Sequence, residues 1–269
     1  MMRKTMRFLL LAALLAAGLL TAASAEGAVQ AMTTADGLRA AVLASDGLVR
    51  FEFPARPGVW GDGHNWNFTS KADRRWGRPT GCSGCTNGPV KVTLRVEDGV
   101  VRRIESQLGG RWPQAGRDLG SVDPGVAADY LLALAERGVE EESAEEAIQA
   151  AVASEAALGD EIWPRLIGLA RDRSRGEDLR STALFWAAQE AGQRAAADIE
   201  DIATASDDET EVQEAAVFAL TQMPDGGTDA LLRLARENRN PRIIQSIFFW
   251  LGQSDDPRAV ELFEDVLLN

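Results

Sequence analysis

The chain has very few of the side chains on which most catalytic and metal sites depend. Its 269 residues include two cysteines and one histidine. A serine–histidine–acid triad would have to use His64, and no serine lies in a Gly-x-Ser-x-Gly turn. No glycine-rich loop has the pattern of a phosphate-binding site, since the glycines at 226 and 227 fit a turn between two helices. The sequence therefore predicts a protein that is not an enzyme and uses no cofactor.

Long apolar segments are also missing after the first 25 residues. Three basic residues precede an apolar run over residues 8–20, and the small residues Ala23-Ser24-Ala25 follow it. This pattern predicts a secretory signal peptide over residues 1–25. No later segment approaches the roughly 20 apolar residues that span a bilayer. We expect an exported protein, periplasmic or secreted, without stable insertion in the membrane.

Acidic residues outnumber basic ones, and the two halves of the chain differ in sign. The formal net charge is −13, and −16 without the three basic residues of the predicted signal peptide. Residues 50–118 carry 12 Lys and Arg against 7 Asp and Glu, whereas residues 122–269 carry 12 against 31. An acidic surface repels nucleic acid phosphates and keeps an exported protein soluble. We therefore expect no nucleic acid partner. Besides solubility, the acidic surface could bind a basic partner, or the acidic half of the chain could dock onto its basic half.

Residues 48–121 are predicted to form a small β-rich domain, after a linker or one marginal helix over residues 26–47. Residues 48–53 alternate apolar and charged side chains, the period-two pattern of a half-buried strand. Two further strands are joined at Asp98-Gly99, a strong signal for a tight hairpin. A long loop rich in glycine, tryptophan and asparagine separates the first strand from this hairpin.

The rest of the chain, residues 122–269, is predicted to be helical. Asp123 can cap the first helix, Pro124 suits its first turn, and Gly138 can end it. A helix over about 143–157 is expected to pair with another over about 160–171. With the copies that follow, this gives about four helix pairs, enough for one continuous core.

Three segments of this region repeat one helical pattern at intervals of 31 to 33 residues. The equivalent positions are Leu179, Leu184, Phe185 and Gln189, then Val212, Val217, Phe218 and Gln222, then Ile243, Phe248, Phe249 and Gln253. A recurring helix–turn–helix unit cannot bury its apolar face alone, so the copies are predicted to stack into an α-solenoid. We expect Phe185 and Phe249 to lie in its core, and Trp186 and Trp250 to pack between helices.

The period and the apolar positions resemble HEAT-like repeats of the short bacterial kind, over roughly residues 143–269. The layout also looks like exported HEAT-repeat proteins with a small β domain before the array. The predicted fold class is therefore mainly α, with a C-terminal HEAT-like α-solenoid. The resemblance implies a scaffold in which the second helix of each pair lines a concave, protein-binding face. Candidate residues on that face are Arg165, Asp198, Arg233, Arg236, Glu237, Glu261 and Glu264.

Cys82 and Cys85 lie in the long loop of the β-rich domain. In an oxidising compartment, two cysteines at this spacing favour a local disulfide. One alternative is a redox dithiol, whose first cysteine would need to lie at a helix N-terminus. Here glycines and Pro89 surround the pair instead. The other is a zinc site completed by His64 and a carboxylate such as Asp62.

The same loop carries Trp60, Trp66, Phe68 and Trp76 beside arginine and asparagine. Such a composition is typical of surfaces that recognise sugars or proteins, although a small domain can also fill its core with tryptophan. The predicted function is an exported, non-enzymatic scaffold that binds protein partners in the cell envelope. A thiol-redox or zinc-dependent activity of the β-rich domain, and carbohydrate binding by its tryptophan-rich loop, are the alternatives.

Overall fold

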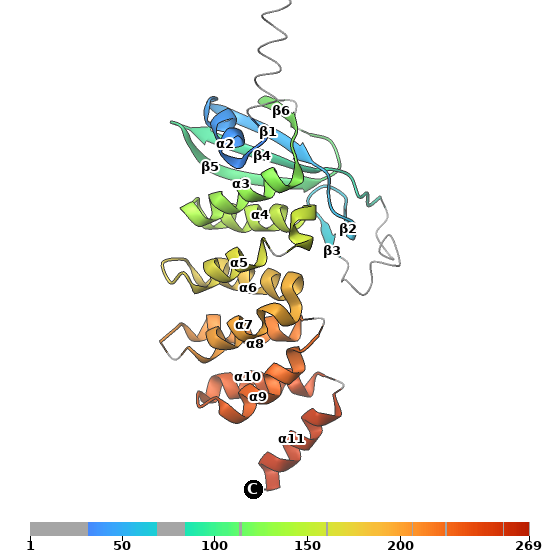
Figure 1. The fold of residues 1–269 in the computed structure, drawn as a ribbon, viewed down its shortest axis with the longest axis vertical. Coiled ribbons are helices and arrows are strands. Elements are labelled where there is room, and N and C mark those ends of the chain that lie inside the picture. Colours follow the sequence, from blue (N-terminus) through green and yellow to red (C-terminus); the bar gives the residue numbers. More distant parts are fainter. Residues whose placement is uncertain are drawn as a thin grey trace, which may run out of the picture.

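The computed structural model describes residues 32–68, 84–112, 115–159, 161–205, 207–223, 225–254 and 256–268. The predicted signal peptide lies outside these residues. A small sheet occupies one end of an elongated molecule, and helices follow it in successive layers to the C-terminus (Figure 1). The protein is mainly helical, with a mixed sheet in its N-terminal half.

Four strands form the main sheet, in the order β5-β4-β1-β6. Their bounds are β1 Gly47–Phe53, β4 Val90–Glu97, β5 Val100–Leu108 and β6 Arg117–Ser121, and a separate pair consists of β2 Val59–Gly61 and β3 Trp66–Phe68. β1 pairs antiparallel with β4 and parallel with β6. The predicted hairpin is confirmed, because β4 and β5 pair antiparallel on either side of Asp98 and Gly99. These two turn residues have φ angles of 52° and 69°. These left-handed values suit a type I′ turn, in which aspartate and glycine are favoured.

One face of the sheet is buried against helices. Val49, Phe51 and Phe53 of β1 are fully buried and alternate with more exposed neighbours, as the sequence pattern predicts. The ring of Phe51 lies 6.4 Å from that of Tyr130 on the first long helix of the helical region. Each such side chain contributes about 1.5–3 kcal/mol on full burial, so this face joins the sheet and the helices in one core.

Helix α2 (Ala35–Leu43) forms within the segment predicted to be a linker or one marginal helix. The side chain of Thr34 caps its start by accepting a hydrogen bond from the Gly37 N–H. Leu38 and Val42 are fully buried. A nine-residue helix is not stable alone in water, so contacts with the core hold it in place.

Helix α3 (Pro124–Arg137) begins and ends where the sequence predicts. The Asp123 carboxylate accepts hydrogen bonds from the Gly125 and Val126 N–H groups. Gly138 ends the helix in the left-handed conformation, with φ of 87°. Glycine adopts this conformation without the steric cost that other residues meet.

The remaining helices stack in layers beyond α3 (Figure 1). They are α4 Glu141–Val152, α5 Trp163–Arg171, α6 Glu177–Ala191, α7 Ala196–Thr204, α8 Thr210–Thr221, α9 Gly227–Glu237, α10 Pro241–Gly252 and α11 Pro257–Leu268, with 3₁₀ turns at Glu155–Leu158 and Gly192–Ala195. α3 packs against α4, α5 against α6, α7 against α8, and α9 against α10. We call α4, α6, α8 and α10 the even row, and α3, α5, α7 and α9 the odd row. Each layer thus joins the second helix of one sequence repeat to the first helix of the next, instead of pairing α4 with α5.

The repeated apolar positions do not all lie in the core. The first two positions are buried at Leu179, Leu184, Val212, Val217 and Ile243, and half-buried at Phe248. At the third position, Phe185 and Phe218 are half-buried and Phe249 is 57% exposed. The expectation that Phe249 is a core residue was therefore wrong, and Phe185 is less buried than its neighbour Trp186, which is 9% exposed. A residue one step further along a helix lies about 100° around its axis, so this position faces away from the core stripe.

Candidate functional site

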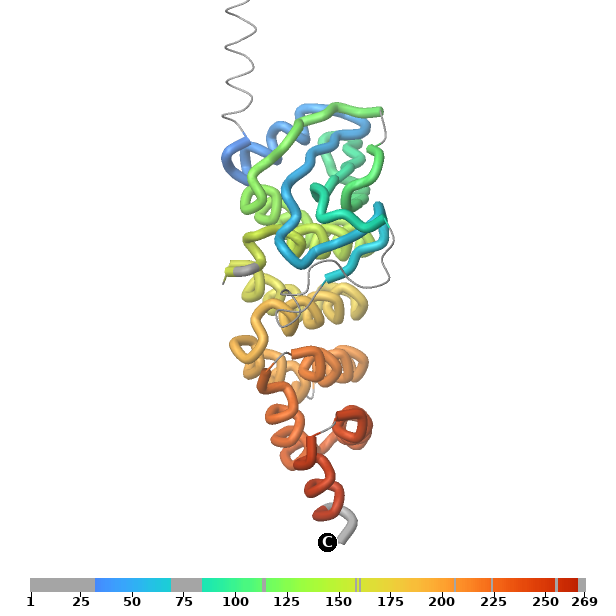
Figure 2. The backbone as a smooth tube through the Cα atoms, turned by 90° about the vertical axis from the view of Figure 1, so that its right-hand side faces the viewer, coloured from blue at the N-terminus to red at the C-terminus, as the bar shows by residue number. Residues whose placement is uncertain are grey.

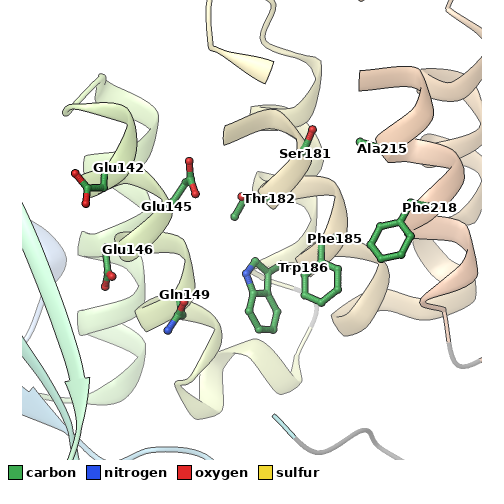
Figure 3. A pocket seen from close by; sticks show the side chains of 10 residues that line it. All are labelled: Glu142, Glu145, Glu146, Gln149, Ser181, Thr182, Phe185, Trp186, Ala215 and Phe218. Atoms are coloured by element: carbon green, nitrogen blue, oxygen red, sulfur yellow. The ribbon is translucent and has the colours of Figure 1, made fainter. Parts of the chain in front are cut away.

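A hollow on the even row brings acidic and aromatic side chains together. It has a volume of about 460 Å³ and spans α4, α6 and α8 (Figure 3). Its lining consists of Glu142, Glu145, Glu146 and Gln149 from α4, Ser181, Thr182, Phe185 and Trp186 from α6, and Ala215 and Phe218 from α8. Residues three and four apart lie on one face of a helix, which explains how each helix presents several side chains to the hollow.

A second hollow, of about 500 Å³, adjoins the first and shares Gln149 and Trp186 with it. Its other lining residues are His64, Asn65, Trp66, Asn67 and Phe68. They belong to β3 and the turn before it, on a strand pair that lies beside the helical layers (Figure 2). We call the two hollows together the aromatic groove.

Aromatic rings follow the groove and continue past it. Phe68 lies edge-on to Trp186 with ring centres 4.5 Å apart, and Phe185 is stacked on Phe218 at 6.5 Å. The other contacts are Trp66–Phe68 at 6.1 Å, Phe185–Trp186 at 5.0 Å, Phe218–Trp250 at 5.1 Å and Phe249–Trp250 at 5.0 Å. An unbroken row of rings therefore runs from β3 to α10 along the even row.

Carboxylates crowd the α4 side of the groove. Burial, followed by the negative charges of Asp178 and Glu141, raises the pKa of Glu145 above its usual value, against the effect of a hydrogen bond with Thr182. A bound cation would relieve this repulsion between carboxylates. The electrostatics of the groove therefore favour a positively charged ligand.

A buried ion pair holds the β2–β3 side of the groove to α6. Arg56 donates from Nη1 to Glu190 Oε2 at 2.6 Å, and from Nη2 to Glu190 Oε1. The two side chains are only 7% and 4% exposed. The Arg56 N–H also donates to the Ala153 carbonyl at 2.8 Å. These bonds between distant parts of the chain position Phe68 against Trp186.

The predicted binding residues lie outside the groove, on the odd row and α11. Three of them form ion pairs between layers: Arg165 with Glu136 at 2.6 Å, Arg233 with Glu200 at 2.5 Å, and Asp198 with Arg171 at 2.8 Å. Arg236 donates to the Leu232 carbonyl of its own helix at 3.2 Å. Glu237, Glu261 and Glu264 are exposed. The structure thus gives Arg165, Asp198 and Arg233 a role in joining layers.

Cys82, one of the two predicted disulfide cysteines, lies outside the described residues. Trp76 of the tryptophan-rich loop also lies outside them. The disulfide, redox and zinc hypotheses therefore stay predictions. Cys85 is 7% exposed, and the exposed His64 has its Nδ1 3.2 Å from the Ser106 carbonyl oxygen. Among the residues that the structure describes, no group of three or more His, Cys, Asp and Glu side chains could hold a metal ion.

Sequence reasoning found part of the groove and missed the rest. It named Trp66 and Phe68 as part of a candidate recognition surface, but it interpreted Trp186 as helix packing and did not name Glu145 or Phe218 as site residues. The available signals were the glutamates at 142, 145 and 146, spaced for one helix face, and the third repeated position, which is aromatic in all three copies.

No family model, curated protein or solved structure matches the chain. Within the described ranges, no helix is both long enough and apolar enough to cross a membrane. The function is therefore inferred from the chemistry of the groove.

Proposed function

We propose that the protein is an exported, non-enzymatic scaffold whose stacked helices form a HEAT-like α-solenoid. In this proposal the aromatic groove binds a basic, extended segment of a partner protein in the cell envelope. The observation that carries the proposal is the meeting of aromatic rings and three glutamates in one hollow. A lysine or arginine side chain can lie over an aromatic ring and pair with a carboxylate beside it.

The spacing of the helices indicates how such a segment would lie. The axes of packed helices are about 8–10 Å apart, and an extended chain advances about 3.3 Å per residue. Basic residues at every third position would therefore meet in turn α4, α6 and α8, the three helices that line the groove. On the other side of the groove, the exposed Asn65 donates from its amide nitrogen to Asp62 at 3.0 Å, and its amide oxygen can accept a hydrogen bond from a peptide backbone.

The first test uses a twelve-residue peptide with arginine at every third position and serine or glycine elsewhere. Phe218→Ala should weaken its binding tenfold or more, since truncating an aromatic anchor costs about 2 kcal/mol. Glu145→Gln should weaken binding less, and affinity should fall with rising salt because exposed charges are screened beyond about 10 Å at 0.1 M. Fluorescence anisotropy of the labelled peptide measures both effects.

Matched controls remove the same groups outside the groove. Phe249→Ala and Glu237→Gln should leave the affinity for the peptide unchanged, because neither residue lines the groove. A chain with Glu237→Arg and Glu261→Arg tests the face that the resemblance to HEAT-like repeats implies, because both residues are exposed and reversed charges there would repel the arginine peptide. If that chain loses the peptide while Phe218→Ala retains it, that face binds the peptide and the groove proposal fails. Competition by neutral oligosaccharides would instead favour carbohydrate binding.

A further inference from the structure

A third hollow, of about 430 Å³, lies where α2, α3 and β5 meet. Its lining includes Arg39 from α2, Arg102 from β5, and Tyr130, Leu134 and Arg137 from α3. It shares no lining residue with the aromatic groove. Three arginines from three separate elements thus converge on one cavity of a size common for small-molecule sites.

None of these three arginines has a hydrogen bond or ion pair within the described part of the chain. Carboxylates are not in short supply, because the chain has 41 Asp and Glu against 28 Lys and Arg. Elsewhere, arginines such as Arg165 and Arg258 pair with carboxylates of other helices. One carboxylate, Glu140, also lines the hollow. The lining therefore keeps an excess of positive charge.

Tyr130, the only tyrosine of the chain, adds an unsatisfied hydrogen-bonding group. Its side chain is 1% exposed, and its hydroxyl is buried without a partner in the described structure. Burial raises the pKa of Tyr130, while the positive charges of Arg39 and Arg137, which line the same hollow, act to lower it. A buried hydroxyl without a partner destabilises a fold, unless a ligand supplies that partner.

The remaining wall of the hollow is apolar. Val101 and Leu134 are 5% and 7% exposed, and Leu43 and Val139 are half-buried beside them. An inorganic anion would leave this surface in contact with water, whereas a hydrocarbon or aromatic group would cover it.

We propose that this hollow binds a small amphipathic anion, with its carboxylate or phosphate on the arginines and Tyr130 and its apolar body on Val101 and Leu134. Arginine presents a planar fork of donors that matches both headgroups. The site is separate from the aromatic groove and would give the scaffold a second, small-molecule ligand.

Decanoate, used below its micelle concentration, is the probe, and isothermal titration calorimetry of the full chain is the measurement. We expect saturable binding of decanoate, with much weaker binding of acetate, inorganic phosphate and decylamine. Arg39→Gln and Arg137→Gln should each weaken decanoate binding roughly tenfold, because each removes a charge-assisted hydrogen bond. Arg239→Gln, which removes an exposed arginine outside the hollow, is the control and should have no effect.

Tyr130→Phe separates a ligand-binding role from a structural one. Without ligand it should keep or raise the unfolding temperature, since the lost hydroxyl has no partner, yet it should weaken decanoate binding. Equal binding of decylamine, or unchanged affinity in both arginine variants, would overturn the proposal. Inorganic phosphate binding as tightly as decanoate would show a simple anion site and overturn the amphipathic assignment. Binding of the arginine peptide to the groove should not change in any of these variants, so the two proposals can fail separately.

Discussion

Replacing Arg180 by methionine is expected to lower the free energy of unfolding by about 3–5 kcal/mol, as is typical when one partner of a buried ion pair is removed. The Arg180 side chain is fully buried at the start of α6. It donates to the Ala170 carbonyl at 2.7 Å, to Asp208 at 2.6 Å and to Glu209 at 2.6 Å. It therefore joins α5, α6 and the segment before α8. Its loss would leave the Asp208 carboxylate, 4% exposed, with only a longer contact of 3.9 Å to the partly exposed Arg173.

Urea unfolding of the two proteins at neutral pH measures this difference, and Arg242→Met is the matched control. Arg242 lies on the surface, 61% exposed, and pairs with Glu214 at 3.4 Å. An exposed pair contributes about 0–1 kcal/mol. A cost for Arg180→Met no larger than that of Arg242→Met would contradict the assignment of Arg180 as the connection between layers.

The same pair predicts a change in acid sensitivity. Burial acts to raise the pKa of Asp208, but hydrogen bonds from Arg180 and from the Glu209 N–H outweigh it and hold the pKa at about 2, below the usual 3.8. The unfolded chain therefore takes up this proton first, so the stabilisation is complete above about pH 4 and is lost as the pH falls through 2. The difference in stability between the natural chain and Arg180→Met should shrink from pH 5 to pH 2. A constant difference over that range would argue against the ionised pair.

Arg56→Met is the second substitution with a large expected effect, again about 3–5 kcal/mol, because it removes the two-pronged basic partner of the buried Glu190 carboxylate. Unlike Arg180, Arg56 joins the β-rich part to the helices. Its guanidinium also lies 6.0 Å from the ring of Phe68 in the groove. Arg56→Met should therefore weaken binding of the arginine peptide as well as stability.

A double-mutant cycle tests the pairing directly. The chain with both Arg56→Met and Glu190→Leu should recover most of the lost stability, because an apolar pair leaves no charge buried without a partner. Arg103 and Glu105 on β5, 53% and 55% exposed, give the control pair, and their replacement should change stability by less than about 1 kcal/mol. Additive losses in the double variant would show that Arg56 and Glu190 do not act as a pair.

Local chemistry accounts for the elements that the sequence predicted correctly. The hairpin turn needs two left-handed residues, and Asp98 and Gly99 provide them. Helix α3 lies between Asp123, whose carboxylate accepts from two N–H groups of the first turn, and Gly138, which adopts the left-handed conformation that ends a helix. Interactions over so short a range can be recognised without knowing what packs nearby.

Element boundaries and core membership were harder to predict. The helix expected over residues 143–157 ends at Val152, and the next begins at Trp163 rather than near residue 160. Phe249 repeats an apolar position, yet lies on the surface. An apolar repeat identifies a helix, but the orientation of that helix in its layer decides which of its neighbouring large side chains are buried.

The amino-acid order by itself determined a mainly helical chain after a small β-rich part, its main turns and caps, its acidic excess and its scarcity of catalytic side chains. The partners of Arg56 and Arg180, 134 and 28–29 residues away, emerged only on folding. The same holds for the aromatic groove, which joins β3 to three helices, and for the arginines gathered around Tyr130. Such sites depend on how helices and strands pack. Packing is set by the shape and burial of whole faces, which no local pattern of residues specifies.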